Sequence, residues 1–198
     1  MREKELKNTV NFLFEAGMLA KTPRSGFYFL GSGKQSVAEH INRAIFIGYV
    51  LAFMNKKADL NKVLKMCLFH DFAEARVSDL NYVHQKYTER HEDRAIEDIV
   101  RTVPFGDDIK DILHEYEERK SVESLLAKDS DSLELLLALK EQSDIGNSKA
   151  NTWMPSLVKR LKTKEAKELA KIILKTNSDD WWFQEKEGDW WINRNNKQ

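Results

Sequence analysis

Apolar residues recur at intervals of three and four along most of this chain, which is the spacing of amphipathic α-helices. The first such segment, residues 3–16, is followed by Gly17, a residue type that commonly ends helices. Ser36 and Glu39 have the spacing of a capping box, so a helix is predicted from there to about Met54. The same periodicity predicts further helices over residues 60–75, 88–103, 107–119, 122–142 and 155–175.

Two parts of the chain depart from this pattern. Residues 21–35 contain Pro23 and three glycines, so we expect an ordered loop with a short extended piece at residues 27–30. Residues 177–198 hold two tryptophan pairs around Gly188, which favours a hairpin or an extended cover that packs on the helices or at a dimer interface. We therefore predict an all-α fold, with a multi-helix bundle over residues 1–176 and a Trp-rich C-terminal extension.

Composition narrows the class of protein. The chain has 198 residues, of which 41% are hydrophobic, and this is enough for the core of one domain. Lysine plus arginine and aspartate plus glutamate both number 32, so no basic field is expected to attract a nucleic acid polymer. Three features predict a cytoplasmic protein without a membrane span. The chain has a single cysteine, Cys67, its N-terminal segment is charged, and its longest apolar run, residues 44–54, is too short to span a membrane.

Titratable residues occur inside the apolar helical segments. The stretch "CLFHDFAEARVSDL" places His70 and Asp71 together and follows them with Glu74 and Asp79. On a helix, Glu74 would lie one turn beyond His70 and Asp71, so the three side chains could converge. His40 likewise falls on an apolar stripe, where a histidine is more often a structural, hydrogen-bonded residue than a ligand.

Asp129 and Asp131 stand at the start of the most apolar helix, and its periodicity does not decide which of them faces a site. Burying such groups costs several kcal/mol each unless they are paired, and imidazoles and carboxylates pair well around a divalent cation. The pattern therefore indicates a metal site. The segment "GSGKQS" is not a P-loop, because Gln35 stands where a Ser or Thr should follow the lysine.

The order His40, His70-Asp71 and Asp131 resembles the HD-domain metal-dependent phosphohydrolase superfamily. Four blocks are similar to its nucleotidase family, which removes the phosphate from (deoxy)nucleoside 5′-monophosphates. They are "FLFEAGMLAKTPRSGF", "SVAEHINRA", "LFHDFAEARVSDL" and "EYEERKSVESLLAKDSDSLELLL", and they span about residues 8–142. The resemblance implies that His40, His70, Asp71 and Asp131 hold one divalent metal ion, which could be Mn, Co, Mg, Ni, Fe or Zn.

The resemblance also implies roles for three further residues. Glu74 corresponds to the catalytic glutamate of the family, and Asp79 to its further acidic residue, which would orient the water or the leaving ribose oxygen. Arg24 corresponds to the arginine that binds the phosphate. The resemblance implies a reaction in which a metal-activated water attacks the phosphate of a 5′-nucleotide. It also implies that the enzyme is a homodimer.

Two other functions stay open. One is hydrolysis of a cyclic nucleotide, a nucleoside triphosphate or an alarmone, for which Lys34 and Arg43 are the candidate extra cations. The other is a non-catalytic scaffold that binds a nucleotide.

Overall fold

The computed structural model describes residues 2–183, 188 and 192. In this part of the chain the elements are α-helices and short 3-10 turns, with no β-strand, which confirms the all-α prediction. The helices are α1 (Glu3–Ala16), α2 (Phe27–Leu30), α3 (Val37–Met54), α4 (Leu60–Phe69), α5 (Glu74–Val77), α6 (Glu92–Val100), α7 (Gly106–Glu118), α8 (Val122–Asp144), α9 (Ser148–Arg160), α10 (Lys164–Ile173) and α11 (Asp180–Phe183).

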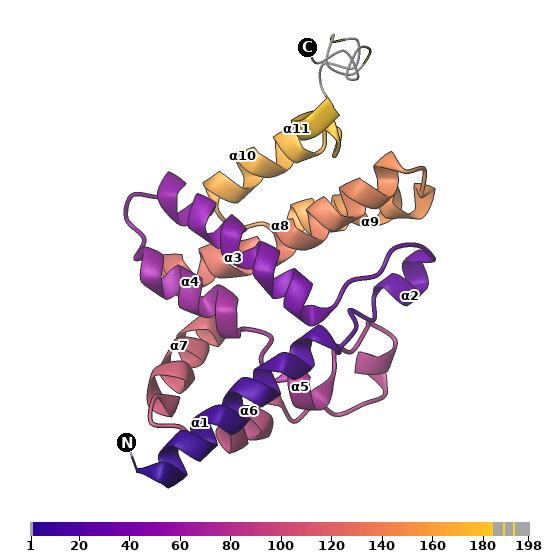
Figure 1. Ribbon diagram of the computed structural model, residues 1–198. Helices are drawn as coiled ribbons and strands as arrows, with labels where there is room; N and C mark the ends of the chain where they lie inside the picture. The colour runs from indigo at the N-terminus through magenta and orange to yellow at the C-terminus, as the bar shows by residue number, and fades with distance from the viewer. Residues whose placement is uncertain (1, 184–187, 189–191, 193–198) are drawn as a thin grey trace, which may run out of the picture.

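The long helix α8 lies at the centre of the bundle (Figure 1). It packs against α3, α4, α7, α9 and α10, while α3 also packs on α4. Four leucines of α8 are almost fully buried and supply much of the main hydrophobic cluster: Leu126, Leu133, Leu136 and Leu139. A smaller cluster joins α1, α3 and the α4–α5 turn, where Phe12 packs on Phe72.

Helix α3 begins where the capping box predicts. The Ser36 hydroxyl accepts a hydrogen bond from the Glu39 backbone N–H, and the Glu39 carboxylate accepts one from the Ser36 N–H. Among the described residues α3 is also the one helix whose length and apolar composition would suffice to cross a membrane. It carries buried His40 toward α8, so this helix belongs to the core of the bundle.

Several predicted boundaries were wrong. The helix predicted over residues 60–75 ends at Phe69, because the following N–H groups, including those of Phe72 and Glu74, bond to carbonyls three residues earlier and tighten the chain into a turn. Residues 88–91 are not helical, and α6 begins only at Glu92. Residues 27–30 form a helical turn rather than an extended piece.

The helix predicted over residues 155–175 is divided into α9 and α10, and Pro155 lies inside α9 instead of starting it. The break follows from a tertiary contact, since buried Asp129 of α8 accepts hydrogen bonds from the backbone N–H groups of Lys162 and Thr163. Trp181 belongs to the helical turn α11 and is exposed. The predicted hairpin around Gly188 falls mostly outside the described residues.

Gly48 sets the distance between α3 and α4. A Cβ atom added at this position would lie 2.7 Å from the Cys67 sulfur and 3.3 Å from Cγ1 of Val63. Gly48→Ala should therefore lower the free energy of unfolding by about 1–3 kcal/mol through overpacking, although alanine is the better helix former by about 1 kcal/mol. Urea denaturation followed by circular dichroism measures the change.

Gly17→Ala is the matched control, since no atom would lie within 4 Å of its new Cβ. It should leave the stability unchanged or raise it. The double substitution Gly48→Ala/Cys67→Ala should recover part of the lost stability. A Gly48→Ala protein as stable as the unsubstituted one would contradict close α3–α4 packing at this point.

Candidate metal centre and active site

Three elements carry the four predicted ligands: His40, His70 and Asp131 offer ligand atoms that all lie within 4.8 Å of one another, and Asp71 lies beside the two histidines. His40 projects from the first half of α3, and Asp131 projects from α8. His70 and Asp71 lie in the tight turn after α4, where neighbouring residues can both point at one place more easily than on a regular helix, whose successive side chains diverge by about 100°. The side chains of His40 and His70 are buried or nearly so, while those of Asp71 and Asp131 are partly exposed, and all but His40 line a cavity.

The ligand atoms of this group lie close to one another. His40 Nε2 is 3.2 Å from His70 Nε2, 3.4 Å from Asp71 Oδ2 and 3.3 Å from Asp131 Oδ1. Nε2 of His70 is 3.4 Å from the same Asp71 oxygen. Ligands bound at right angles to one ion, each at about 2.0–2.3 Å, are about 3 Å apart, so these spacings fit a single metal ion.

The hydrogen bonds on the far sides of both imidazoles support the same conclusion. Nδ1 of His40 is 2.6 Å from Glu134 Oε2, and Nδ1 of His70 is 3.0 Å from the Cys67 carbonyl oxygen. A carbonyl oxygen and an ionised carboxylate can only accept, so each Nδ1 carries the hydrogen. In the neutral rings both Nε2 lone pairs then face each other beside two carboxylates, an arrangement that a cation stabilises.

The charges of the cluster are strongly coupled. Burial lowers the pKa of His70, which keeps this ring neutral and able to bind a metal. Burial opposes ionisation of Asp131, but nearby Lys128 and His40 outweigh it and hold the pKa of Asp131 well below its usual value. Burial and Arg24 disfavour the charged form of His40, yet hydrogen bonds to Asp131 and Glu134 raise its pKa to about 9. A metal ion would replace that proton.

Glu74 has the properties of a proton donor. Burial, together with the nearby Asp71 and Asp79 carboxylates, raises the pKa of Glu74 to about 9. Its Oε2 atom is buried without a hydrogen-bond partner, and the residue lines the cavity that contains the ligand cluster. In the metal-free chain this carboxyl group therefore holds a proton near neutral pH, which a bound substrate could accept.

Arg24 is held over the cluster from the loop before α3. Its NH1 atom is 3.2 Å from Asp71 Oδ2. Burial disfavours the charged form, but Asp71, Asp131 and Asp79 outweigh this and raise the pKa of Arg24 above its ordinary value. The next residue, Ser25, donates its N–H to Asp79 Oδ2 at 2.7 Å. Asp79 thus fastens the loop that carries Arg24, and it lines the same cavity.

Asp129 and Asp131, which periodicity alone does not distinguish, have different partners. Asp129 is buried and bonds to the chain between α9 and α10, at 2.7 Å from both the N–H and the hydroxyl of Thr163. Asp131 faces His40 with one oxygen and Lys128, at 2.7 Å, with the other. Only Asp131 of this pair joins the ligand cluster.

The cavity above the cluster has a volume of about 720 Å³. One part of its wall is apolar and includes Leu139, Trp153 and Leu157. The rest carries charges of both signs. Its cations, which the sequence reasoning did not identify, are Arg90, Arg119, Lys128 and Arg160, and the first three are paired with Glu92, Glu117 and Asp131 respectively. They come from several elements that approach one another only in the folded chain, so no local sequence signal groups them.

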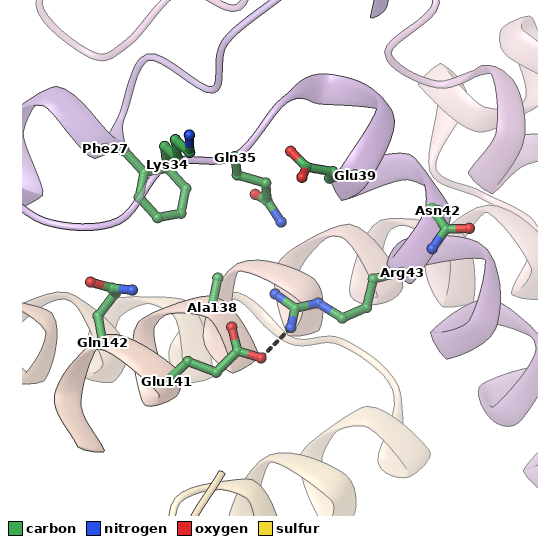
Figure 2. A pocket seen from close by; sticks show the side chains of 9 residues that line it. All are labelled: Phe27, Lys34, Gln35, Glu39, Asn42, Arg43, Ala138, Glu141 and Gln142. Atoms are coloured by element: carbon green, nitrogen blue, oxygen red, sulfur yellow. Dashed lines mark hydrogen bonds and ion pairs between the residues drawn. The ribbon is translucent and has the colours of Figure 1, made fainter. Parts of the chain in front are cut away.

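Lys34 and Arg43, the cations expected for a longer phosphate chain, do not line this cavity. They border a separate pocket of about 320 Å³ (Figure 2). Arg43 is already bound there to Glu134 and Glu141, through its NH2 and NH1 atoms respectively. Glu134 was also missed by the sequence reasoning, although a charged residue inside "LELLLALK" was a usable signal.

Comparisons with known proteins agree with this geometry. The HD domain family matches residues 16–173. The 5′-deoxynucleotidase HDDC2 of Dictyostelium discoideum is 32% identical over 145 residues, which cover 67% of this chain and 76% of the relative. A conserved hypothetical protein from Pyrococcus furiosus has a similar structure, with a TM-score of 0.71 and 26% identity over 84% of this chain and 99% of its own.

A further structure is similar in fold alone. It is the cyanophage S-2L HD phosphohydrolase DatZ, described as bound to dA and one catalytic Zn²⁺ ion. It has a TM-score of 0.54 and 19% identity, and the match covers 82% of this chain and 96% of DatZ.

The different partners of the two aspartates give a matched test. Asp131→Asn should weaken Mn²⁺ binding by more than the roughly 10- to 100-fold that loss of an outer-shell partner costs. Asp129→Asn should bind Mn²⁺ as the unsubstituted protein does but lose about 1–3 kcal/mol of stability, because its amide would meet N–H donors. Calorimetric titration with manganese chloride and denaturation in EDTA measure the two effects. Equal Mn²⁺ affinities in the two variants would refute the assignment.

Proposed function

This chain belongs to the HD domain family, and we propose that it is a metal-dependent phosphohydrolase that removes the phosphate from (deoxy)nucleoside 5′-monophosphates. The observation that carries the proposal is the convergence of two imidazoles and two carboxylates beneath a cavity that also contains Arg24 and Glu74. The name of the Dictyostelium relative, a 5′-deoxynucleotidase, supports this substrate class.

We propose His40, His70, Asp71 and Asp131 as the ligands of one divalent ion, with Mn, Co, Mg, Ni, Fe and Zn as the candidates. Such an ion supplies Lewis acidity, which lowers the pKa of a bound water and offsets phosphate charge. The mixture of imidazole and carboxylate ligands suits transition metals, and zinc is the ion named for the similarly folded DatZ.

The residues around the ligands divide the remaining work. Arg24 binds the phosphate oxygens with charge-assisted hydrogen bonds and can exchange its contact with Asp71 for them. When water adds to phosphorus and the bond to O5′ breaks, Glu74 donates its proton to O5′. One proton of the added water returns to Glu74, so the products are a nucleoside and hydrogen phosphate and Glu74 is protonated again. Asp79 holds the loop that carries Arg24, because it accepts a hydrogen bond from the Ser25 N–H, and it would orient the attacking water or the leaving ribose oxygen. The apolar wall near Trp153 accommodates the nucleoside.

Phosphate release by metal-stripped protein tests the function. The protein is restored with Mn²⁺, Co²⁺, Mg²⁺, Ni²⁺, Fe²⁺ or Zn²⁺ and assayed against 5′-monophosphate, 3′-monophosphate, cyclic, triphosphate and alarmone nucleotides. We expect metal-dependent release from 5′-monophosphates, none from Asp71→Ala, and a rate about 10²- to 10⁴-fold lower in Glu74→Gln. Glu74→Gln should keep its Mn²⁺ affinity, because Glu74 is not among the proposed ligands.

Other outcomes identify the alternatives. Release from cyclic nucleotides, triphosphates or alarmones alone would replace the proposal with the second hydrolase function, and the cations Arg90, Arg119, Lys128 and Arg160 would then contact the longer phosphate chain. Metal binding without release from any nucleotide would favour the non-catalytic scaffold.

We further propose that two copies associate through α3, with residues 1–176 as the bundle and 177–198 as an extension that contributes to the interface. Four exposed apolar side chains lie on one face of α3, at intervals of three and four residues: Phe46, Tyr49, Val50 and Phe53. The helix that leads into the extension, α10, packs on α3. A second copy would cover this face. We also propose a cytoplasmic location, which the lone, unpaired Cys67 supports, because disulfides form mainly in oxidising compartments.

The oligomeric state tests this interface. Phe53 is 78% exposed, so Phe53→Glu should leave the fold intact while placing charge in the interface and converting dimer to monomer. Multi-angle light scattering gives the mass. Phe14→Glu, at an equally exposed position of α1, serves as the control and should remain dimeric. A monomeric unsubstituted protein would refute the proposal.

A further inference from the structure

Glu134 lies at the centre of a buried network behind the ligand cluster. It follows Asp131 by one turn of α8, and its side chain has no exposed surface. Its Oε2 atom is 2.6 Å from Nδ1 of His40. Its Oε1 atom accepts hydrogen bonds from Gln35 Nε2 at 2.6 Å and from Arg43 Nε at 2.9 Å.

We propose that Glu134 is a positioning residue, which accepts the Nδ1 hydrogen of His40 and thereby directs the Nε2 lone pair of His40 at the metal. The inference rests on the proposed function, because it presupposes that His40 holds a metal. A neutral imidazole carries one hydrogen, so a hydrogen fixed on Nδ1 leaves Nε2 free to bind. The other tautomer would place a hydrogen between His40 and His70, where the ion must sit.

The surroundings of Glu134 leave its carboxylate a single orientation. Gln35 and Arg43 bind Oε1, so Oε2 is the oxygen that meets His40. The Arg43 guanidinium also balances the buried negative charge, which would otherwise be costly. A carboxylate behind a metal-binding histidine increases the basicity of the ring and fixes its rotation. Glu134 therefore acts on both the tautomer and the aim of His40.

Glu141 offers a matched control. It lies on the same helix and binds the same guanidinium, but through NH1 and at the exposed side of the second pocket (Figure 2). Each of the substitutions Glu134→Gln and Glu141→Gln therefore removes one negative charge beside Arg43, on opposite sides of its guanidinium. Only Glu134→Gln alters a group in contact with His40.

The test is calorimetric titration of metal-stripped protein with manganese chloride. Glu134→Gln should raise the Kd for Mn²⁺ by about 10- to 100-fold, while Glu141→Gln should leave it within about 2-fold of the unsubstituted protein. Equal affinities in Glu134→Gln and the unsubstituted protein would overturn the inference even if phosphate release is normal. The Mn²⁺ effect without any release of phosphate from 5′-monophosphates would support the inference and refute the proposed function.

A measurement on the unsubstituted protein guards against a Glu134→Gln variant that does not fold. Zinc is diamagnetic, so a long-range ¹H–¹⁵N spectrum of the zinc-loaded protein reports the state of each histidine ring nitrogen. The His40 signals are those missing from His40→Asn. A protonated Nδ1 with a metal-bound Nε2 supports the inference, and a metal-bound Nδ1 overturns it.

Discussion

The burial of charged and polar groups between α3, α4 and α8 is the constraint on which the structure depends. His40 and Glu134 have no exposed surface, and each would cost several kcal/mol if it were left without partners. The helices that carry these groups also carry the buried leucines of the main cluster, so the hydrophobic core fixes the distances between the ligand atoms. Metal binding and folding are therefore coupled: an ion at 100 times its Kd adds about 2.7 kcal/mol to stability.

Much of the fold follows from periodicity, and one of the exceptions has a tertiary cause. The helices at residues 3–16, 37–54, 106–118 and 122–144 begin and end within about two residues of their predicted positions. Serine caps fix the start of two of them, since Ser36 and Ser121 each accept a hydrogen bond from the N–H three residues on. The pattern across residues 155–175 is also continuous, but the buried Asp129 carboxylate captures backbone N–H groups from residues 162 and 163 and ends α9 there. No local property of those residues announces a partner 33 positions earlier.

Less of the site than of the fold could be predicted from the pattern of residues. Periodicity indicated buried imidazoles and carboxylates, but the choice of Asp131 over Asp129 came from family resemblance, and the structure supplies the physical reason in their different partners. The expected helical geometry around His70 was wrong, yet the turn brings His70 and Asp71 together, and Glu74 lines the same cavity. Glu134 was overlooked: its charge in an apolar helix signals a buried partner, but the chain identifies Gln35, His40 and Arg43 as its partners only once it is folded.

Charge balance explains why this cavity suits an anion. Two carboxylates and two neutral imidazoles would cancel the charge of a divalent ion, so the ligand set alone gives little attraction for a phosphate. Arg24 and Lys128 supply the excess, each bound to Oδ2 of a proposed ligand, Asp71 and Asp131 respectively. The other charged residues of the wall balance in number, since Arg90, Arg119 and Arg160 face the same cavity as the Asp79, Glu92 and Glu117 carboxylates. A phosphate dianion restores neutrality, whereas an uncharged substrate would leave two cations facing an apolar wall.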